Sequence, residues 1–267
     1  MATHSATKSL LLCVMDGHGE NGDGVAIYMK RNFPDKLFNH PSFATDIEKA
    51  ITDALDACEN ELLKKTKIDC EFSGTTFVCA VVRDGLVTCA NVGDSRCIVG
   101  VKGPDGKLAG VAVSIDHKPE LPLEKARILK AGGRVFAVQY DDGIPGPNRV
   151  WLGNIDVPGL AMSRSIGDTV AHTAGVTSIP EFFTQKLVEG QHAVMVLASD
   201  GLWEFMDDQA VMDKINEGTP GKDVAGIVDI LVEEANSLWL KAEEVIDDTT
   251  VCVACLYGHT ISAPSRK

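Results

Sequence analysis

The stretch TTFVCAVVRDGLVTCANVGDSRCIVGVK, residues 75–102, decides the fold. It predicts strands over Thr75–Arg83 and Leu86–Asn91, joined by Asp84-Gly85, a dipeptide that is typical of a tight hairpin turn. Residues 96–114 predict a second pair of strands, joined by a turn rich in glycine and proline. Hairpin-linked strands that follow one another in this way indicate antiparallel sheets.

Helices are predicted on both sides of this strand-rich centre. Before it come a buried strand over residues 8–15, a helix over Val25–Phe38, and a longer helix opened by a capping box of Thr45 and Glu48. After it come a helix (123–131), strands (134–138 and 149–152), a strand pair (182–188 and 193–198, with a turn at 189–191), helices (207–216 and 222–240) and a last strand (249–257). We therefore predict an α+β fold, a central antiparallel β-sandwich flanked by α-helices on both faces, forming one domain over residues 1–267.

Composition narrows the class of protein. With 45% hydrophobic residues the chain suits a globular core and not a disordered segment. Lys plus Arg number 25 and Asp plus Glu 38, a formal charge of −13, so neither nucleic acid nor an anionic membrane is expected as a partner. Apolar runs stay far below the ~20 residues of a membrane span. The start, MATHSATKS, does not resemble a secretory signal, so we expect reduced cysteines and a cytoplasmic location, with a nuclear one left open.

A glycine-rich loop follows the first predicted strand. Residues 17–22 match the pattern GxGxxG, which in dinucleotide-binding proteins is followed by a helix and then by a second parallel strand. Here a second helix follows, no strand is predicted before Thr75, and Asp16 stands where it would repel a pyrophosphate. We therefore reject a nucleotide-binding oxidoreductase.

Aspartates recur at the ends of buried strands. Asp16-Gly17 and Asp200-Gly201 follow two similar apolar runs, Asp94 and Asp168 end two further segments, and Asp247 precedes the last apolar strand. One such acid is usually a solvated turn residue, but a set of them beside buried strands needs compensating charge. Carboxylate oxygens favour hard cations such as Mg²⁺ or Mn²⁺.

A CxxC pair lies within the last predicted strand. Such a pair can bind zinc or carry redox chemistry, but in a strand the side chains of Cys252 and Cys255 point to opposite faces. We interpret both as packing residues.

Motifs along nearly the whole chain resemble those of the PP2C family of metal-dependent protein serine/threonine phosphatases. In order, they are Asp16-Gly17-His18-Gly19, Ser73-Gly74-Thr75-Thr76, Asn91-Val92-Gly93-Asp94-Ser95-Arg96, Asp116-His117-Lys118-Pro119, Arg127-Ile128, Ala131-Gly132-Gly133, residues 160–168 (LAMSRSIGD), residues 198–203 (ASDGLW) and Asp247-Asp248. Each motif alone is weak, whereas the ordered set is specific, and residues 149–168 are most like the plant and protist branch.

This resemblance implies two Mg²⁺ or Mn²⁺ ions in a cleft at one end of the sandwich. Asp16 would bridge the two ions, and the Gly17 carbonyl would bind one of them. Asp200 and Asp247 would complete the protein ligands of the other ion.

The resemblance further implies a third metal position and a flap. Asp168 and Glu204, together with Asp200, match positions that hold a weaker third ion in some members, although Glu204 stands where many members have Asp. Residues 169–181 fall where the family carries a flap over the cleft.

The implied activity is hydrolysis of phosphoserine and phosphothreonine in phosphoprotein substrates. A metal-activated water would attack phosphorus in line, with Asp16 holding the ions and His18 protonating the leaving oxygen. His117 is expected to hold a loop in place. The alternative is a pseudophosphatase or phosphoprotein-binding module, and the sequence leaves the oligomeric state open.

One part of the family pattern is not matched. The resemblance implies strands before Asp16 that carry a phosphate-gripping Arg and a Glu-Asp pair, but residues 1–15 contain neither Arg nor an acid. We therefore expect an unpaired sheet edge that is prone to association, retained metal binding, and weaker phosphatase activity than in a version that carries such a segment.

Overall fold

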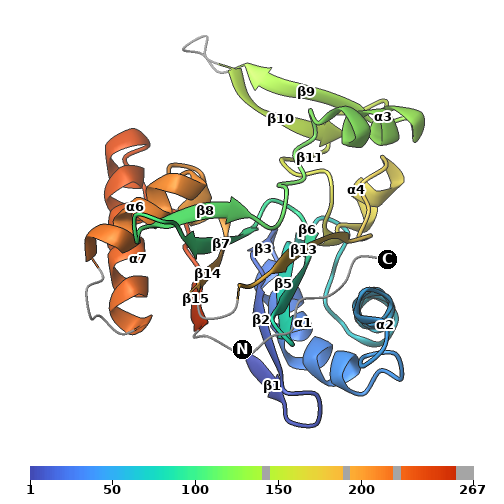
Figure 1. Ribbon diagram of the computed structural model, residues 1–267. Helices are drawn as coiled ribbons and strands as arrows, with labels where there is room; N and C mark the ends of the chain where they lie inside the picture. Colours follow the sequence, from blue (N-terminus) through green and yellow to red (C-terminus); the bar gives the residue numbers. More distant parts are fainter. Residues whose placement is uncertain (140–144, 189–192, 219–223, 257–267) are drawn as a thin grey trace.

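Two antiparallel sheets form the centre of the protein. The computed structural model describes residues 1–139, 145–188, 193–218 and 224–256 (Figure 1). The first sheet has the strand order β1 (Ala2–His4), β2 (Ser9–Val14), β5 (Phe77–Arg83), β6 (Leu86–Val92) and β13 (Glu181–Lys186). The second has the order β15 (Val251–Leu256), β14 (Ala193–Ala198), β7 (Arg96–Lys102) and β8 (Leu108–Ala112).

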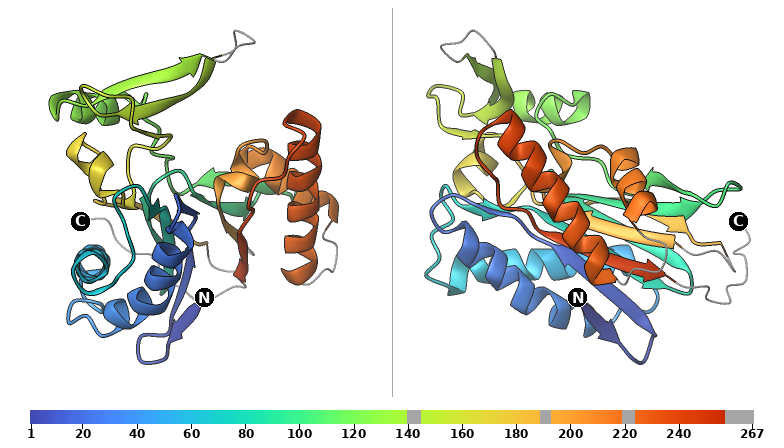
Figure 2. Two further views of the ribbon diagram at one scale, coloured as in Figure 1. Left: turned by 180° about the vertical axis from the view of Figure 1, so that it is seen from behind. Right: turned by 90° about the vertical axis from the view of Figure 1, so that its left-hand side faces the viewer.

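Helices cover the outer faces of both sheets (Figure 2). They are α1 (Gly22–Phe38) and α2 (Ile47–Lys65) on the first sheet, and α6 (Asp208–Gly218) and α7 (Val224–Ala242) on the second. Three apolar layers result: one under α1 and α2, one between the sheets, and one under α6 and α7. The predicted α+β sandwich with helices on both faces is therefore confirmed. None of the helices in the described ranges is long and apolar enough to cross a membrane.

Smaller elements stand beside the sandwich. A three-stranded sheet of β9 (Arg134–Gln139), β10 (Pro145–Trp151) and β11 (Pro158–Leu160) packs with α3 (Pro122–Lys130) and α4 (Thr169–Thr173), at the top of Figure 1. A second small sheet joins β3 (Gly17–His18), β4 (Gly74–Thr75) and β12 (Ile166–Gly167). The short helix α5 (Asp200–Trp203) follows β14.

The hairpin at Asp84-Gly85 has the predicted conformation. Both residues have positive φ, 47° at Asp84 and 66° at Gly85. Two such residues form the turn whose twist matches that of the flanking strands. The turn sets Arg83 opposite Leu86 and fixes the register of β5 against β6.

One predicted strand pairing is wrong. The strands predicted over 182–188 and 193–198 exist as β13 and β14, but β13 pairs with β6, whereas β14 lies between β7 and β15 in the other sheet. Neighbours in sequence need not be neighbours in a sandwich, because each strand joins the sheet whose free edge its side chains fit. The turn predicted at 189–191 lies outside the described residues.

The N-cap of α2 lies one residue after the predicted one. Asp46, rather than Thr45, is the N-cap, and its Oδ1 accepts a hydrogen bond from the Lys49 backbone N–H at 3.0 Å. The Thr45 hydroxyl donates instead to the Ser42 carbonyl at 3.5 Å. Aspartate also suits this position because its negative charge interacts favourably with the positive end of the helix dipole.

Asp46→Ala should lower the free energy of unfolding by about 1 kcal/mol, the usual cost of losing a helix cap. Thr45→Ala, the matched control, should change it by less than about 0.5 kcal/mol. Urea unfolding followed by circular dichroism measures both. A larger loss in Thr45→Ala than in Asp46→Ala would contradict the assigned cap.

Candidate functional site

Two of the predicted aspartates meet at the ends of facing strands. β2 and β14 contact each other across the sandwich, and Asp16 and Asp200 follow them. Burial and the charges of Asp94 and Asp16 raise the pKa of Asp200 to about 8, and the two carboxyl groups share a hydrogen bond. Burial is also the main cause that raises the pKa of Asp16. The pair is thus a partly buried acid couple whose ionised forms are disfavoured.

Asp247 approaches the same pair from the segment before β15. The charge of Asp247 raises the pKa of Asp16, although the Asp247 residue is exposed. The segment is held because the Thr250 N–H donates to the Ser199 hydroxyl at 3.0 Å, and the Ser199 N–H donates to the Thr250 carbonyl at 3.1 Å. Gly201 permits this approach, since a Cβ there would lie 2.5 Å from the Asp248 carbonyl oxygen.

Asp94 is a fourth acid at this site. Its residue is 2% exposed, and its charge raises the pKa of both Asp16 and Asp200. Lys118 Nζ lies 2.6 Å from Asp94 Oδ2, and its charge lowers the pKa of Asp200. The sequence placed Asp94 among the strand-end acids but gave it no role. Lys118 was missed, although the motif that contains it was noted.

The loop that carries Lys118 is held in place by the two residues that precede the lysine. Arg96 binds both carboxylate oxygens of Asp116, at 2.9 and 2.7 Å. His117 is fully buried; its Nδ1 accepts from the Gly93 N–H at 3.1 Å, so Nε2 carries the proton that is donated to Glu181 at 3.2 Å. These contacts support the interpretation of His117 as a residue that holds a loop, and the loop delivers Lys118 to the acids.

His18 is bound by a second predicted site residue. Its Nε2 lies 2.6 Å from Asp168 Oδ2. Burial lowers the pKa of His18, but the hydrogen bond and charge of Asp168 outweigh burial, so the net shift is upward. Gly74 makes room for this contact, because a Cβ there would lie 2.2 Å from Asp168 Oδ2. Asp168 itself has a strained φ of +41°.

The other predicted ligands lie on nearby elements. Gly17 belongs to β3 and pairs with Thr75. Glu204 ends α5 and is exposed, whereas Asp168 is buried against His18. The third-metal set of Asp168, Asp200 and Glu204 therefore stays a prediction, as does the flap over residues 169–181.

A buried ion cluster holds the segment that leads to Asp168. Glu124, on α3, accepts hydrogen bonds from Arg127, Arg164 and Ser163 at 2.7, 2.7 and 2.6 Å. Burial raises the pKa of Glu124, but these donors outweigh it and leave the pKa well below its usual range. The cluster anchors residues 163–168 to α3.

The donor chemistry of the site suits a hard cation. Asp16 and Asp200 are partly buried carboxyl groups that form no salt bridge with a basic side chain in the described part of the chain. In that same part, no three His, Cys, Asp or Glu side chains lie close enough together to hold a metal ion as they stand. These residues fit a cation in charge and in ligand type. To coordinate one, their side chains would have to move closer together.

Comparison with known proteins gives the family. The family model for Protein phosphatase 2C matches residues 2–236. Probable protein phosphatase 2C 72 of Arabidopsis thaliana is 33% identical over 97% of this chain and 80% of its own length. Probable protein phosphatase 2C 12 of Oryza sativa subsp. japonica is 38% identical, and the match covers 80% of this chain and 54% of the relative. The chain belongs to the protein phosphatase 2C family.

Solved structures share the fold. The serine-threonine phosphatase 2C from Toxoplasma gondii superimposes with a TM-score of 0.77 at 22% identity, covering 93% of this chain and 85% of that one. A sex determining protein of C. elegans gives a TM-score of 0.73 at 20% identity, covering 93% of this chain and 56% of the other. Both support the sandwich architecture.

The neutral state of His117 predicts a pH dependence of stability. Burial, followed by the charge of Arg164, lowers the pKa of His117 from 6.5 to about 3. The folded chain leaves this ring unprotonated where the unfolded chain protonates it, so His117 stabilises the fold above pH ~6.5 and this contribution is lost as the pH falls towards 3. The slope is about 1.4 kcal/mol per pH unit.

His117→Asn keeps an acceptor for the Gly93 N–H and removes the titration. Its free energy of unfolding should therefore fall less steeply than that of the wild type between pH 6.5 and 4, as measured by urea unfolding. Thr45→Ala, which changes a residue that does not titrate, should keep the wild-type slope. Equal slopes in all three proteins would contradict a buried neutral His117.

Proposed function

We propose that the protein hydrolyses phosphoserine and phosphothreonine in phosphoproteins, at a dinuclear Mg²⁺ or Mn²⁺ centre. The observation that carries the proposal is the partly buried Asp16–Asp200 couple in a chain of this family. Asp16, the Gly17 carbonyl, Asp200 and Asp247 would hold the ions. Bound at carboxylates, such ions supply a water of lowered pKa and offset the charge of a phosphate.

Residues of this chain would prepare the site for that chemistry. The Asp16–Asp200 couple places two carboxyl groups at the point where cations are needed, and these oxygens would hold an ion in place of the proton that they share. Lys118 already neutralises Asp94, which limits the excess charge to the remaining acids. The neighbouring backbone is fixed because the Asp16 carbonyl accepts from the Thr76 N–H at 2.9 Å, so Asp16 is held in place before any ion arrives.

His18 is the proposed acid for the leaving oxygen. Its Nε2 is engaged by Asp168, and its Nδ1 is buried with no hydrogen-bond partner in the described ranges. Nδ1 is therefore the ring atom left to give a proton. Asp168 orients the ring, and its negative charge keeps the ring protonated to higher pH.

Asp200→Asn should abolish most activity, with a loss of at least ~100-fold in phosphate release from a phosphothreonine peptide with Mn²⁺. EDTA should have the same effect on the wild type. Asp213→Asn, which changes an exposed acid on α6, is the matched control and should remain active. Calorimetry of Mn²⁺ binding should show weaker binding in Asp200→Asn alone. Activity that ignores both EDTA and Asp200→Asn would refute the metal mechanism.

His18→Gln should slow hydrolysis of a phosphoserine peptide at least ~10-fold more than hydrolysis of p-nitrophenyl phosphate. An alkoxide is a poor leaving group and needs the proton, whereas p-nitrophenolate leaves without one. His40→Gln should affect neither substrate. The measurement is kcat for both substrates in each variant. An equal loss on both substrates would assign His18 a role other than that of the acid.

A further inference from the structure

Two cysteines stand directly opposite each other in the first sheet. Cys13 of β2 is the register partner of Cys79 of β5, and both side chains belong to the apolar layer under α1. Cys13 lies near enough to Cys79 to contribute to the raised pKa of the Cys79 thiol. All eight cysteines are free, so this pair is in its reduced form.

The backbone hydrogen bonds place this pair at a position suited to a disulfide. The Thr76 N–H donates to the Asp16 carbonyl, so the hydrogen-bonded pairs of this ladder fall on the even-numbered residues of β2. Cys13 and Cys79 are therefore a non-hydrogen-bonded pair, for which Cα atoms lie about 4.5 Å apart. That separation is within the range of about 4.4–6.8 Å that disulfides span.

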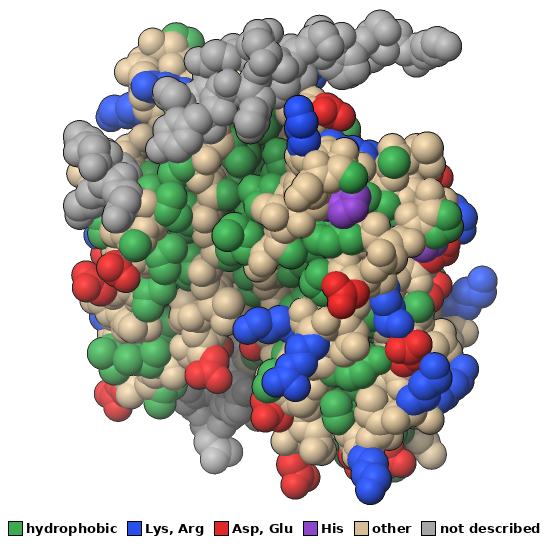
Figure 3. Space-filling model, turned by 90° about the horizontal axis from the view of Figure 1, so that it is seen from below, with side chains coloured by type: hydrophobic (Ala, Val, Ile, Leu, Met, Phe, Trp, Pro, Cys, Tyr) green, Lys and Arg blue, Asp and Glu red, His purple; other side chains and the backbone are tan. Residues whose placement is uncertain are grey.

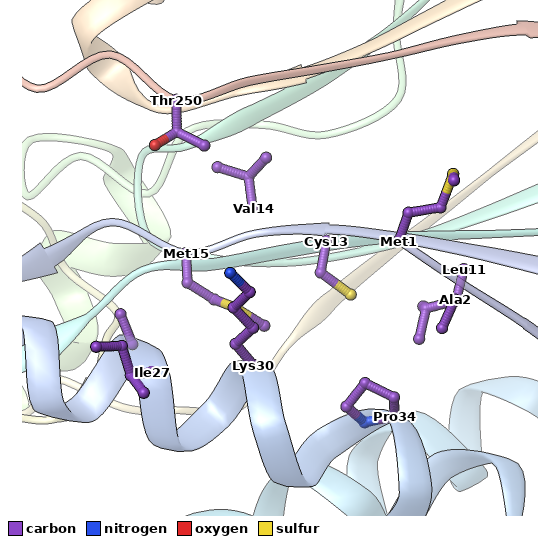
Figure 4. Close-up of a pocket in the computed structure, with 11 residues that line it drawn as sticks. Met1, Ala2, Leu11, Cys13, Val14, Met15, Ile27, Lys30, Pro34 and Thr250 are labelled. Carbon is purple, nitrogen blue, oxygen red and sulfur yellow. The ribbon is translucent and has the colours of Figure 1, made fainter.

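Cys13 is the member that a small oxidant can reach. It is half-buried and lines a groove of about 360 Å³ between β2 and α1, with Lys30 and Pro34 on the helix side (Figure 4). Seen from below, the molecule also shows hydrophobic side chains gathered between charged ones (Figure 3).

The remaining cysteines lack this combination. Cys252 and Cys255 are also half-buried, but their register partners are Leu197 and Val194. Cys252 packs between the sheets, on the opposite face of the first sheet from the layer that holds Cys13. Cys13 is therefore the half-buried cysteine that has a second cysteine as its register partner.

We propose that Cys13 and Cys79 form a reversible oxidation site that a hydroperoxide closes into a cross-strand disulfide. The Cys13 sulfur attacks the peroxide, the O–O bond breaks, and sulfenic acid forms with release of water from hydrogen peroxide. The Cys79 sulfur then attacks the Cys13 sulfur, the S–O bond breaks, and the hydroxyl leaves as water with the Cys79 proton. Two thiols are oxidised and one peroxide is reduced to two waters.

The roles of the two thiols follow from their surroundings. Cys79 is fully buried, and burial is the main cause that raises its pKa well above the usual value. It therefore remains a thiol and acts second, after Cys13 has been oxidised. The product would join β2 to β5 on the strand that leads to Asp16, and a thiol reductant would restore the pair.

The test is peptide mapping of the whole chain after treatment with hydrogen peroxide. Remaining thiols are blocked with N-ethylmaleimide, and the protein is digested without reductant. We expect a linked peptide containing Cys13 and Cys79, lighter than the sum of its parts by two hydrogen atoms, which dithiothreitol converts back to two free peptides. The linked species should be intramolecular, so non-reducing electrophoresis should show a monomeric chain.

Cys13→Ser should remove the linked peptide entirely. Cys255→Ser, the matched change of an equally half-buried cysteine, should leave its yield unchanged. In Cys79→Ala, a dimedone probe should trap at least ~10-fold more sulfenic acid at Cys13 than in the wild type, because the second thiol is missing. Cys13 found as a stable sulfinic acid in the wild type, joined to Cys252, or joined to a second chain would each overturn the proposal.

Discussion

The partial burial of two neighbouring carboxyl groups at the ends of facing strands is the constraint around which this molecule is arranged. β2 and β14 contact each other across the sandwich and are followed by Asp16 and Asp200. Burial and the charges of nearby acids raise the pKa of both carboxyl groups, so their ionised forms are unfavourable here without added positive charge. Short, well-anchored strands hold the two carboxyl groups next to each other. The extensive apolar layers on either side stabilise the fold enough to offset the free-energy cost of this arrangement.

The acids around the Asp16–Asp200 couple fall into two groups: those that are paired with a basic side chain, and those that are not. Asp94 has its own cation in Lys118, and that lysine sits on a loop whose other residues, Asp116 and His117, are also engaged. Asp168 is committed to His18. What remains uncompensated is Asp16 with Asp200, approached by the exposed Asp247. An arrangement that neutralises neighbouring acids and leaves one couple open is what the proposed cation site requires.

Much of the fold could be predicted from the sequence because its signals are local. The Asp84-Gly85 turn sets the β5–β6 register through its own backbone angles, and the apolar periods of the helices identify their buried faces. The strand partner of β13 could not be predicted, because it depends on which sheet edge is free once the chain has folded. The α2 cap was missed by one residue, since Thr45 and Asp46 are both good caps and only the path of the chain decides between them.

The same distinction holds for the site. The sequence placed Asp16 and Asp200 at the ends of similar apolar strands, and strand packing then brings them together. Asp94 and Lys118 lie 24 residues apart, and nothing in either motif states that their side chains meet at 2.6 Å. The Asp168–His18 contact spans 150 residues and depends on the absence of a side chain at Gly74. Contacts of this kind arise from tertiary structure.

The open acid couple links stability to binding. Under the proposed function, a divalent cation bound at this couple would offset the free-energy cost of holding two partly buried carboxyl groups side by side, while the unfolded chain offers no such site. Binding to the folded state alone stabilises it by RT ln(1 + [L]/Kd), about 2.7 kcal/mol at a hundredfold excess over Kd. The residues that lower the stability of the fold by itself are thus the ones that would bind the proposed cation, because charge that the core does not neutralise is what such a ligand would recognise.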